Sequence, residues 1–254
     1  MRYEILPEIG VRIKDITRQK NEIWIATAAK DIHIEAPIFG KSSVGIDILY
    51  NENPIVRLWE IIETKRFWEH SSNLVFAVGR DIAWKVVIAD IAKMSHVLIG
   101  GTTGSGKSVC MDSIIVSVLY KAQPNHVKMI MIDLKEVNLN VYNGIPHLLI
   151  PVITNSQKAL SVLYWTVEEM FERYKKFADF GVHDLKEYNH KIELLSLKDN
   201  SNNLKKIPQI LIIINDLSDL MRINPKETEE SIVRLAVVLQ IKRALDLQII
   251  LAGK

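Results

Sequence analysis

The sequence predicts an α/β fold in which a mostly parallel sheet is wound on both sides by helices. Apolar runs alternate along the chain with segments whose apolar residues recur at helical spacing. The run Ile210–Ile214 is apolar at every position, as expected of a strand buried on both faces of a parallel sheet. The other expected strands are Val127–Asp133 and Leu247–Ala252, and the expected helices are Val109–Tyr120, Ser156–Ala178 and Lys226–Ala244.

A glycine-rich loop follows an earlier apolar run, Val97–Gly100, and matches the pattern G-x-x-x-x-G-K-[ST]. Glycines let backbone N–H groups turn toward phosphate oxygens, and the next helix points the positive end of its dipole there. Lys107 would reach the β- and γ-phosphates, and the Ser108 hydroxyl would bind Mg²⁺. We expect ATP and Mg²⁺ as ligands; the alternative is a glycine turn without a ligand. The expected phosphate-binding residues are Gly101, Thr102, Thr103, Gly104, Ser105, Gly106, Lys107 and Ser108.

Such a loop needs a carboxylate at the end of another core strand to hold Mg²⁺. The run Ile210–Ile214 ends at Asn215 and Asp216, where many ATPases of this kind carry Asp and then Glu. Asn215 lacks the charge, and the Asp216 carboxylate lies about 1.5 Å further back than that of Glu. A displacement of about 1 Å can cost about a hundredfold in rate. We expect Ser108, Asn215 and Asp216 to hold the metal, Lys107 and Asp216 to act in catalysis, and hydrolysis to be slow.

Other alignments of this carboxylate pair give no better site. If Asp216 held the metal, Leu217 would stand where the catalytic acid belongs. Asp133 and Asp219 also lie near strand ends, but a solvated or capping role is at least as well supported for each of them.

The first 73 residues predict a small mixed α/β unit. Val11–Lys14 and Asp31–Glu35 alternate apolar and polar residues and predict strands, and Ile55–Trp68 carries apolar residues at helical spacing. Two apolar runs, Leu74–Ile82 and Trp84–Asp90, flank a turn and predict a hairpin. We therefore expect an N-terminal subdomain over residues 1–73 and an ATPase core over residues 74–254, incomplete at its C-terminus.

Three further expectations concern the second half of the chain. The Ser196–Lys206 segment is polar and predicts a surface loop, and Gly253-Lys254 is expected to hang beyond the carboxyl end of the last strand. One apolar face of the helix Ser156–Ala178 is expected to pack in the core: Leu163, Val167, Met170, Phe171, Tyr174 and Phe177.

Composition limits the possible classes of protein. The chain has 254 residues, 48% of them hydrophobic and 24% charged, so a sizeable core can form. The net charge is only +2, so contacts to a nucleic acid must come from local patches or from an assembly. Cys110 is the only cysteine, which excludes an internal disulfide. No apolar run is long enough to cross a bilayer and none resembles a signal peptide, so we expect a cytoplasmic location without a membrane segment.

Several segments together resemble the FtsK/SpoIIIE family of DNA translocases. Besides the glycine-rich loop, the resemblance is carried by Ala28–Ser42, by Ile132–Lys135 (the family's Ile-Asp-Pro-Lys), by Val141–Leu149 and by Gly181–Asn189. It covers essentially the whole chain. The resemblance implies a RecA-like P-loop core preceded by a small α/β subdomain. It also implies a homo-hexameric ring that hydrolyses ATP to move double-stranded DNA in chromosome or plasmid segregation or transfer.

The chain departs from the family pattern at two places. Asn215-Asp216 replaces the family's Asp-Glu, and the last strand reads Leu251-Ala252-Gly253-Lys254 where the family continues with Thr-Gln-Arg-Pro. The residue expected to sense the γ-phosphate is therefore missing. A hydrolysis-poor, nucleotide-binding paralogue or fragment with a structural role remains the alternative function. The basic pairs Lys175-Lys176, Lys205-Lys206 and Lys242-Arg243 are either DNA contacts or solvated surface.

Overall fold

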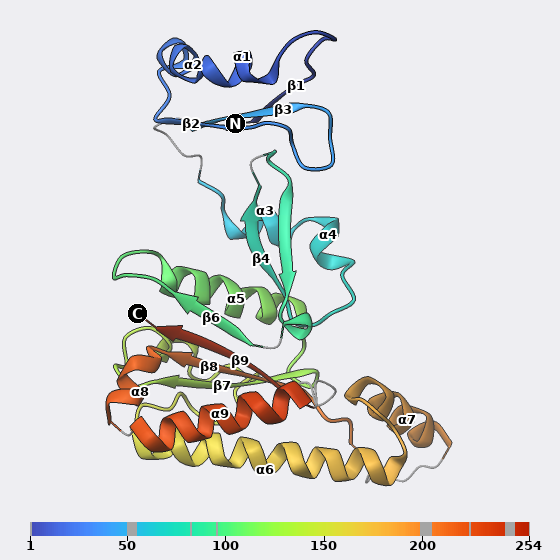
Figure 1. Ribbon diagram of the computed structural model, residues 1–254. Helices are drawn as coiled ribbons and strands as arrows, with labels where there is room; N and C mark the ends of the chain where they lie inside the picture. Colours follow the sequence, from blue (N-terminus) through green and yellow to red (C-terminus); the bar gives the residue numbers. More distant parts are fainter. Residues whose placement is uncertain are drawn as a thin grey trace. The chain divides into compact units, whose positions relative to one another are not determined.

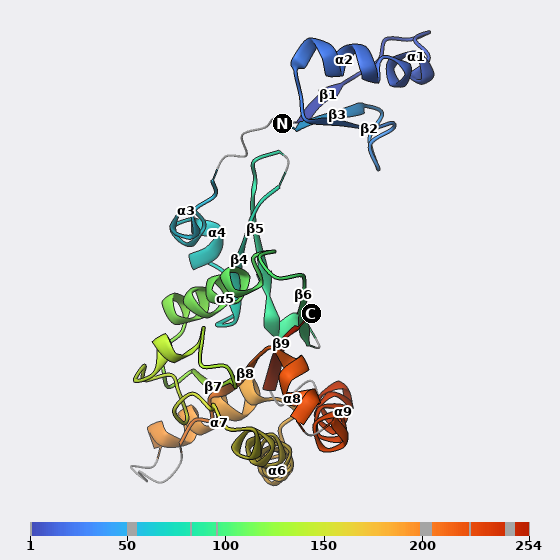
Figure 2. The same ribbon diagram turned by 90° about the vertical axis from the view of Figure 1, so that its left-hand side faces the viewer.

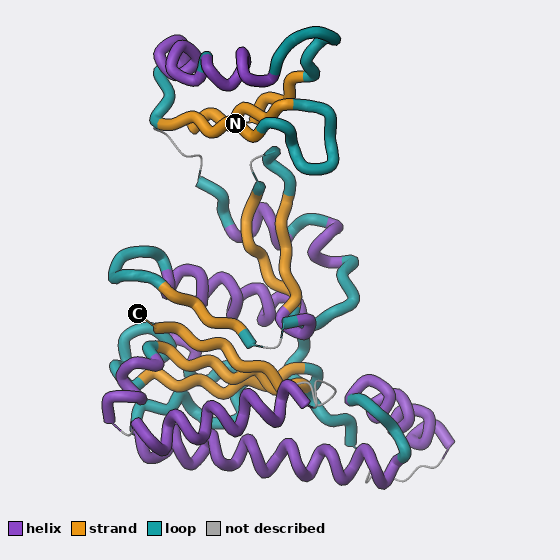
Figure 3. The backbone as a smooth tube through the Cα atoms, in the orientation of Figure 1, coloured by secondary structure: helices purple, strands orange, loops and turns teal. Residues whose placement is uncertain are grey.

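The computed structural model describes residues 2–49, 55–81, 83–94, 96–198, 205–223, 225–241 and 247–253 (Figures 1 and 3). Of residues 234–241 it describes the backbone only. The chain forms two compact units: Met1–Arg66 with Val78–Ile88, and Phe67–Ala77 with Ala89–Lys254. The boundary after Asn73 that the sequence indicates stays a prediction.

The first unit contains a three-stranded antiparallel sheet with two short helices. Strands β1 (Arg2–Ile5), β2 (Asp31–Glu35) and β3 (Val44–Leu49) lie in the order β1-β3-β2. Helices α1 (Ile13–Arg18) and α2 (Lys20–Thr27) contribute Ile16 and Ile23 to a small core with Ile32, Ile46 and Ile48. The strand predicted at Asp31–Glu35 is confirmed.

The strand predicted at Val11–Lys14 is wrong, because α1 begins at Ile13. Four alternating residues fit a strand, but Ile13 and Ile16 are also three residues apart, as on one face of a helix. Packing of Ile16 against the sheet decides for the helix. Tertiary contact thus overrides a short local pattern here.

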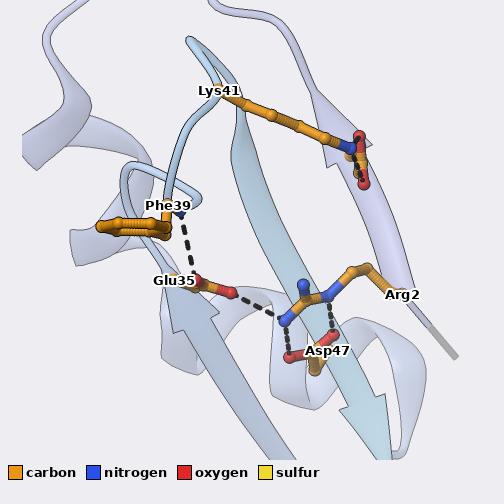
Figure 4. A network of polar contacts seen from close by, with 6 residues as sticks. Arg2, Glu35, Phe39, Lys41 and Asp47 are labelled. Atoms are coloured by element: carbon orange, nitrogen blue, oxygen red, sulfur yellow. Dashed lines mark hydrogen bonds and ion pairs between the residues drawn. The ribbon is translucent and has the colours of Figure 1, made fainter. Parts of the chain in front are cut away.

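Arg2 joins all three strands of this sheet through two carboxylates (Figure 4). Its Nε and Nη2 donate to the two oxygens of Asp47 at 2.6 and 2.7 Å, and Nη2 also donates to Glu35 Oε2 at 2.8 Å. Hydrogen bonds from Arg2, working against burial, hold the pKa of Asp47 below its usual range. Lys41 pairs with Glu4 nearby, but both side chains are about half exposed.

Two short helices and a hairpin follow. The single helix predicted over Ile55–Trp68 is divided into α3 (Leu58–Ile62) and α4 (Lys65–Trp68). The break lies at Thr64, whose hydroxyl donates to the Ile61 carbonyl at 2.7 Å, a local bond of the kind that competes with the helix ladder. The predicted hairpin is confirmed as a two-stranded sheet of β4 (Val75–Arg80) and β5 (Val86–Asp90), followed by the 3-10 turn η1 (Ile91–Lys93).

The second unit is built on a parallel sheet, which confirms the predicted fold class. Strands β6 (Val97–Gly100), β7 (Val127–Asp133), β8 (Gln209–Asn215) and β9 (Leu247–Gly253) lie in the order β6-β9-β8-β7. All neighbours are parallel, so their carboxyl ends lie along one edge. In this register Asp133 lies opposite Asn215, and Gly100 lies opposite Gly253.

Each face of this sheet has its own core, and alternate residues of β7, β8 and β9 divide between the two cores. Helix α5 (Lys107–Lys121) covers one face, where Ile115 packs against Met129 and Ile213. Helices α6 (Ser156–Phe180) and α7 (Leu185–Lys198) cover the other, where Leu163 packs near Ile130 and Ile212. Figures 1 and 2 show α5 and α6 on opposite sides of the sheet. The run Ile210–Ile214 is apolar at every position because this strand is buried on both faces, as predicted.

The remaining elements are the 3-10 turn η2 (Asn140–Tyr142), α8 (Leu217–Ile223) and α9 (Pro225–Ile241), which packs along α6. The predicted helix Lys226–Ala244 is confirmed as far as Ile241, and residues 242–246 lie outside the described residues. The predicted loop Ser196–Lys206 is wrong at its start, because α7 continues to Lys198; residues 199–204 also lie outside the described residues.

The apolar face predicted for α6 is partly wrong. Leu163, Met170 and Phe177 are buried, but Phe171 and Tyr174 are 48% and 50% exposed. The buried row also contains Thr166 and Arg173. Each exposed aromatic follows a buried residue directly and is therefore turned about 100° around the helix. No helix in the described part of the chain combines the length and the apolar character that a membrane span requires.

We expect Arg2→Met to destabilise the first unit by about 2 kcal/mol, because two carboxylates lose charged hydrogen bonds. The measurement is hydrogen exchange of β1, β2 and β3 in the whole chain. The matched control, Lys41→Met, removes an exposed ion pair and should change stability by less than about 0.5 kcal/mol. Equal effects of the two substitutions would contradict this account.

The stabilisation by Arg2 should depend on pH in a defined direction. Because the folded pKa of Asp47 is depressed, its contribution is present above the unfolded value of about 3.9 and is lost as the pH falls toward the folded pKa. The difference in exchange protection between the wild type and Arg2→Met should therefore shrink between pH 6 and pH 3. A constant difference would contradict this assignment.

Candidate functional site

The glycine-rich loop joins the carboxyl end of β6 to α5. Gly104 and Gly106 have φ angles of +82° and +92°, which side chains with a Cβ rarely adopt. At Gly101 a Cβ would lie 2.3 Å from the Ser105 Oγ, so the serine side chain would have to turn away. Helix α5 begins at Lys107, directly after Gly106. The backbone at this edge thus has the form that a phosphate-binding loop requires.

A cavity of about 470 Å³ lies over this loop and brings most of the expected site residues together. The loop contributes Lys107 and Ser108, and the end of β8 contributes Asn215 and Asp216. Gly101 and Ser105 shape the loop without lining the cavity. The lining residues are Thr102, Thr103, Gly104, Gly106, Lys107, Ser108, Val109, Lys135, Val137, Asn138, Asn215, Asp216, Ala252 and Gly253.

Lys107 is held by the end of β9. Its Nζ donates to the Gly253 carbonyl oxygen at 3.2 Å. The prediction that Gly253 hangs beyond the last strand is therefore wrong: it belongs to β9 and positions the loop lysine. Lys254 lies outside the described residues. The Gly253 carbonyl can accept a hydrogen bond from an ammonium group. It has no proton to donate to a phosphate, so it does not replace the side chain that was expected to sense the γ-phosphate.

Asp133 is a buried carboxylate at the end of β7, with 1% of its surface exposed. Its Oδ2 accepts hydrogen bonds from the backbone N–H groups of Asn138 and Leu139 at 2.8 and 2.9 Å. Its Oδ1 accepts from the Asn215 side-chain amide at 3.0 Å. Burial raises the pKa of Asp133, but these hydrogen bonds outweigh burial and leave the pKa below its usual range. Of the solvated or capping role expected for Asp133, the solvated one is wrong and the capping one is confirmed, because the buried carboxylate accepts hydrogen bonds from the backbone of the loop after β7.

Asp216 is paired with a lysine that the sequence analysis did not assign to the site. Lys135 Nζ contacts the carboxylates of Asp216 and of Asp219, the latter at 2.6 Å. Ser218 Oγ donates to the other oxygen of Asp216. Hydrogen bonds from Lys135 and Ser218 lower the pKa of Asp216 to about 2. Asp216 also has a φ of +57°, a strained conformation for a residue other than glycine.

Lys135 and Asn138 could have been found from the sequence in part. Lys135 lies in the segment Ile132–Lys135 that carries the family resemblance, and it follows a strand whose carboxyl end was expected at the ligand edge. The pattern gives no sign that Lys135 reaches Asp216 and Asp219, 81 and 84 residues away along the chain, because β7 and β8 become neighbours only in the sheet.

The described residues fit a nucleotide and Mg²⁺. The loop would hold phosphates through its backbone N–H groups, in a conformation whose positive φ angles at Gly104 and Gly106 favour glycine. Lys107 would supply the positive charge. The Ser108 hydroxyl, Asn215 and Asp216 offer the oxygen ligands that Mg²⁺ prefers. The Asp133 carboxylate is buried and does not line the cavity, so it is not among these ligands.

Of the basic pairs named from the sequence, the two that the structure describes, Lys175-Lys176 and Lys205-Lys206, do not line this cavity. Lys175 pairs with Glu172, and Lys206 pairs with Glu193. Neither Lys175 nor Lys206 lines the cavity. Lys242 and Arg243 lie outside the described residues.

A parallel sheet with a glycine-rich loop between β6 and α5 defines a P-loop NTPase fold, which confirms the expected fold class. The model of the FtsK/SpoIIIE family matches residues 57–254, and that of the FtsK alpha domain matches residues 1–49. The chain therefore belongs to the FtsK/SpoIIIE family.

Curated relatives agree with this assignment. The DNA translocase FtsK of Caldanaerobacter subterraneus subsp. tengcongensis is 47% identical over 251 residues, which are 99% of this chain and 34% of that protein. The DNA translocase SpoIIIE of Bacillus subtilis is 42% identical over 251 residues, 99% of this chain and 31% of that protein. The chain thus spans about a third of the length of these relatives.

Two solved structures share the fold. The pCW3 conjugation coupling protein TcpA with ATPγS aligns with a TM-score of 0.57 and 19% identity, over 99% of this chain and 66% of TcpA. The cytoplasmic domain of the type VII secretion ATPase EccC from Thermomonospora curvata aligns with a TM-score of 0.60 and 19% identity, over 80% of this chain and 25% of that one.

We expect Lys135→Met to raise the pKa of Asp216 from about 2 toward the ordinary value of about 3.9, because its strongest charge partner is lost. NMR titration of the Asp216 carboxyl group in the ligand-free protein measures this shift. Lys128→Met is the control, because Lys128 donates to the Pro146 carbonyl and does not line the cavity. An unchanged pKa in Lys135→Met would contradict the pairing.

Proposed function

We propose that the chain is the ATP-binding motor region of a double-stranded DNA translocase, in which ATP hydrolysis moves DNA during chromosome or plasmid segregation or transfer. The observation that carries this proposal is the cavity over the glycine-rich loop, where Lys107 and Ser108 at the start of α5 meet Asn215 and Asp216 at the end of β8. Membership of the FtsK/SpoIIIE family and the names of the relatives support the choice of DNA as the substrate.

In this proposal the loop backbone and Lys107 bind the β- and γ-phosphates of ATP. Ser108, Asn215 and Asp216 hold Mg²⁺, which neutralises phosphate charge when bound. Asp216 orients the attacking water, with Lys135 holding its carboxylate in place. Lys107 must leave the Gly253 carbonyl or share its protons between this oxygen and a phosphate, which its three N–H donors allow.

A second candidate function, nucleotide binding with slow hydrolysis and a structural role, is favoured by one specific observation. Asp216 is bound by both Lys135 and Ser218, and its pKa of about 2 makes it a weak acceptor for a proton from water. Asn215 also supplies no charge for the metal. Both features slow hydrolysis without disturbing the loop that binds phosphates.

The assembly and partners belong to the same proposal. We propose a homo-hexameric ring around double-stranded DNA, working in the cytoplasm, as the family resemblance implies. Six copies multiply any weakly basic patch around a ring, which would suit a chain whose own net charge is only +2. The proposed domains are the small subdomain over residues 1–73 and the ATPase core over residues 74–254.

Binding of ATPγS to the whole chain tests the loop directly. Lys107→Ala should weaken the affinity at least about tenfold, because the β- and γ-phosphates lose their cation. Lys128→Ala, outside the cavity, should bind as the wild type does. Equal binding by Lys107→Ala and the wild type would contradict a phosphate-binding role for this loop.

Steady-state hydrolysis with and without double-stranded DNA separates the two candidate functions. We expect turnover below about 1 s⁻¹, at the low end of the usual range for enzymes, because Asn215 is uncharged and Asp216 is paired. Acceleration by DNA would support the motor. Fast, DNA-stimulated turnover would exclude the hydrolysis-poor candidate, and turnover that ignores DNA would count against the translocase.

A further inference from the structure

The contact between Asp133 and Asn215 joins the carboxyl ends of two neighbouring strands. The two residues are direct partners in the register of β7 and β8, and Asn215 Nδ2 donates to Asp133 Oδ1 at 3.0 Å. Asp133 is 1% exposed, whereas Asn215 is partly exposed and lines the phosphate cavity. The contact therefore runs from the interior of the sheet to the wall of the candidate site.

The hydrogen bonds of Asp133 fix which end of the Asn215 amide faces it. Two backbone N–H groups, from Asn138 and Leu139, point at Oδ2, so the loop after β7 holds the carboxylate in one orientation. A carboxylate in this setting only accepts hydrogen bonds. Asn215 must therefore turn its Nδ2 toward Asp133, because its Oδ1 would meet another acceptor there.

This orientation leaves Oδ1 as the free polar atom of Asn215. Among the described residues none donates a hydrogen bond to it, and the residue lies on the cavity wall with Ser108 and Asp216. We propose that Asp133 is a positioning residue that fixes the Asn215 amide with its oxygen available to Mg²⁺ or to a water molecule bound to it. This inference rests on the proposed nucleotide site and extends it to Asp133, which lies behind the residues that line the cavity.

In this chain the amide at position 215 supplies the donor for the hydrogen bond that Asp133 accepts. An aspartate there would place two carboxylates in contact where one of them is buried, and the hydrogen bond across the strand ends would be lost. The family pattern carries a carboxylate at this place. Asn215 in place of that carboxylate removes one negative charge from the site but keeps one side-chain oxygen there. We therefore expect Mg²⁺ to bind more weakly rather than not at all.

The test exchanges donor and acceptor across the contact. Asp133→Asn keeps an oxygen for the N–H groups of Asn138 and Leu139 but turns an amide toward Asn215, which must rotate or lose its partner. The double variant Asp133→Asn with Asn215→Asp restores the hydrogen bond with reversed polarity and places the carboxylate at the cavity. Asp112→Asn is the matched control, because Asp112 accepts from the Tyr142 hydroxyl outside the cavity lining.

The readout is the affinity for Mn²⁺ in the presence of ADP, measured by the loss of the free-ion EPR signal. We expect Asp133→Asn to weaken Mn²⁺ binding about tenfold, while ADP affinity in EDTA changes less than about twofold. The double variant should bind Mn²⁺ at least as tightly as the wild type. Because a new carboxylate binds Mn²⁺ through its own charge, Asn215→Asp alone is the reference. The double variant, in which residue 133 donates a hydrogen bond to that carboxylate, should bind Mn²⁺ more tightly than this single variant, in which two carboxylates meet. An unchanged Mn²⁺ affinity in Asp133→Asn, or no recovery in the double variant, would overturn the proposal.

Two further measurements keep the proposal separate from folding and from the proposed function. If Asp133→Asn does not fold, Asn215→Ala serves instead: it leaves Asp133 unchanged and should weaken Mn²⁺ binding to a similar extent. If the wild type binds no ADP, the proposed function fails. The contact itself is then tested without any ligand, since the Asn215 side-chain amide should show slowed proton exchange. Free exchange of that amide would overturn the positioning role of Asp133.

Discussion

The buried carboxylate of Asp133 is the contact on which the arrangement of the candidate site depends. It ends β7, holds the following loop by two backbone hydrogen bonds and holds the end of β8 by a third. That loop then carries Lys135 and Asn138 to the cavity. A carboxylate with 1% exposure is tolerated only because every one of these donors is in place. One hydrogen-bonded group thus sets the positions of two sides of the cavity.

Each of the two lysines that line the cavity already has acceptor oxygens as partners. Lys107 rests on the carbonyl of Gly253, and Lys135 rests on the carboxylates of Asp216 and Asp219. A bound phosphate would compete for both lysines, since ammonium groups are drawn to the strongest nearby anion. Nucleotide binding and the freedom of Asp216 to accept a proton are therefore physically linked in this chain.

Much of the second unit follows from local sequence patterns, and less of the first does. The strands at Val127–Asp133 and Ile210–Ile214 are predicted well, because burial on both faces demands long apolar runs. The helix that begins at Ile13 is missed, because the four residues Val11–Lys14 fit the spacing of a strand as well as that of a helix. Only the packing of Ile16 against the core of the first unit distinguishes the two. The prediction that Phe171 and Tyr174 are buried is wrong for a related reason. Helical spacing shows which residues share a face of α6, but packing decides which face is turned toward the core.

The sequence by itself determines the phosphate-binding loop, because glycines, a lysine and a hydroxyl at fixed spacing act within one short segment. It also shows that Asn215 and Asp216 stand where the family pattern has Asp and Glu, since that difference is one of residue type. Only the tertiary structure decides that Asp133 faces Asn215, that Lys135 holds Asp216 and that Gly253 holds Lys107. These partners are 82, 81 and 146 residues apart along the chain, and the parallel register of the sheet is what brings them together.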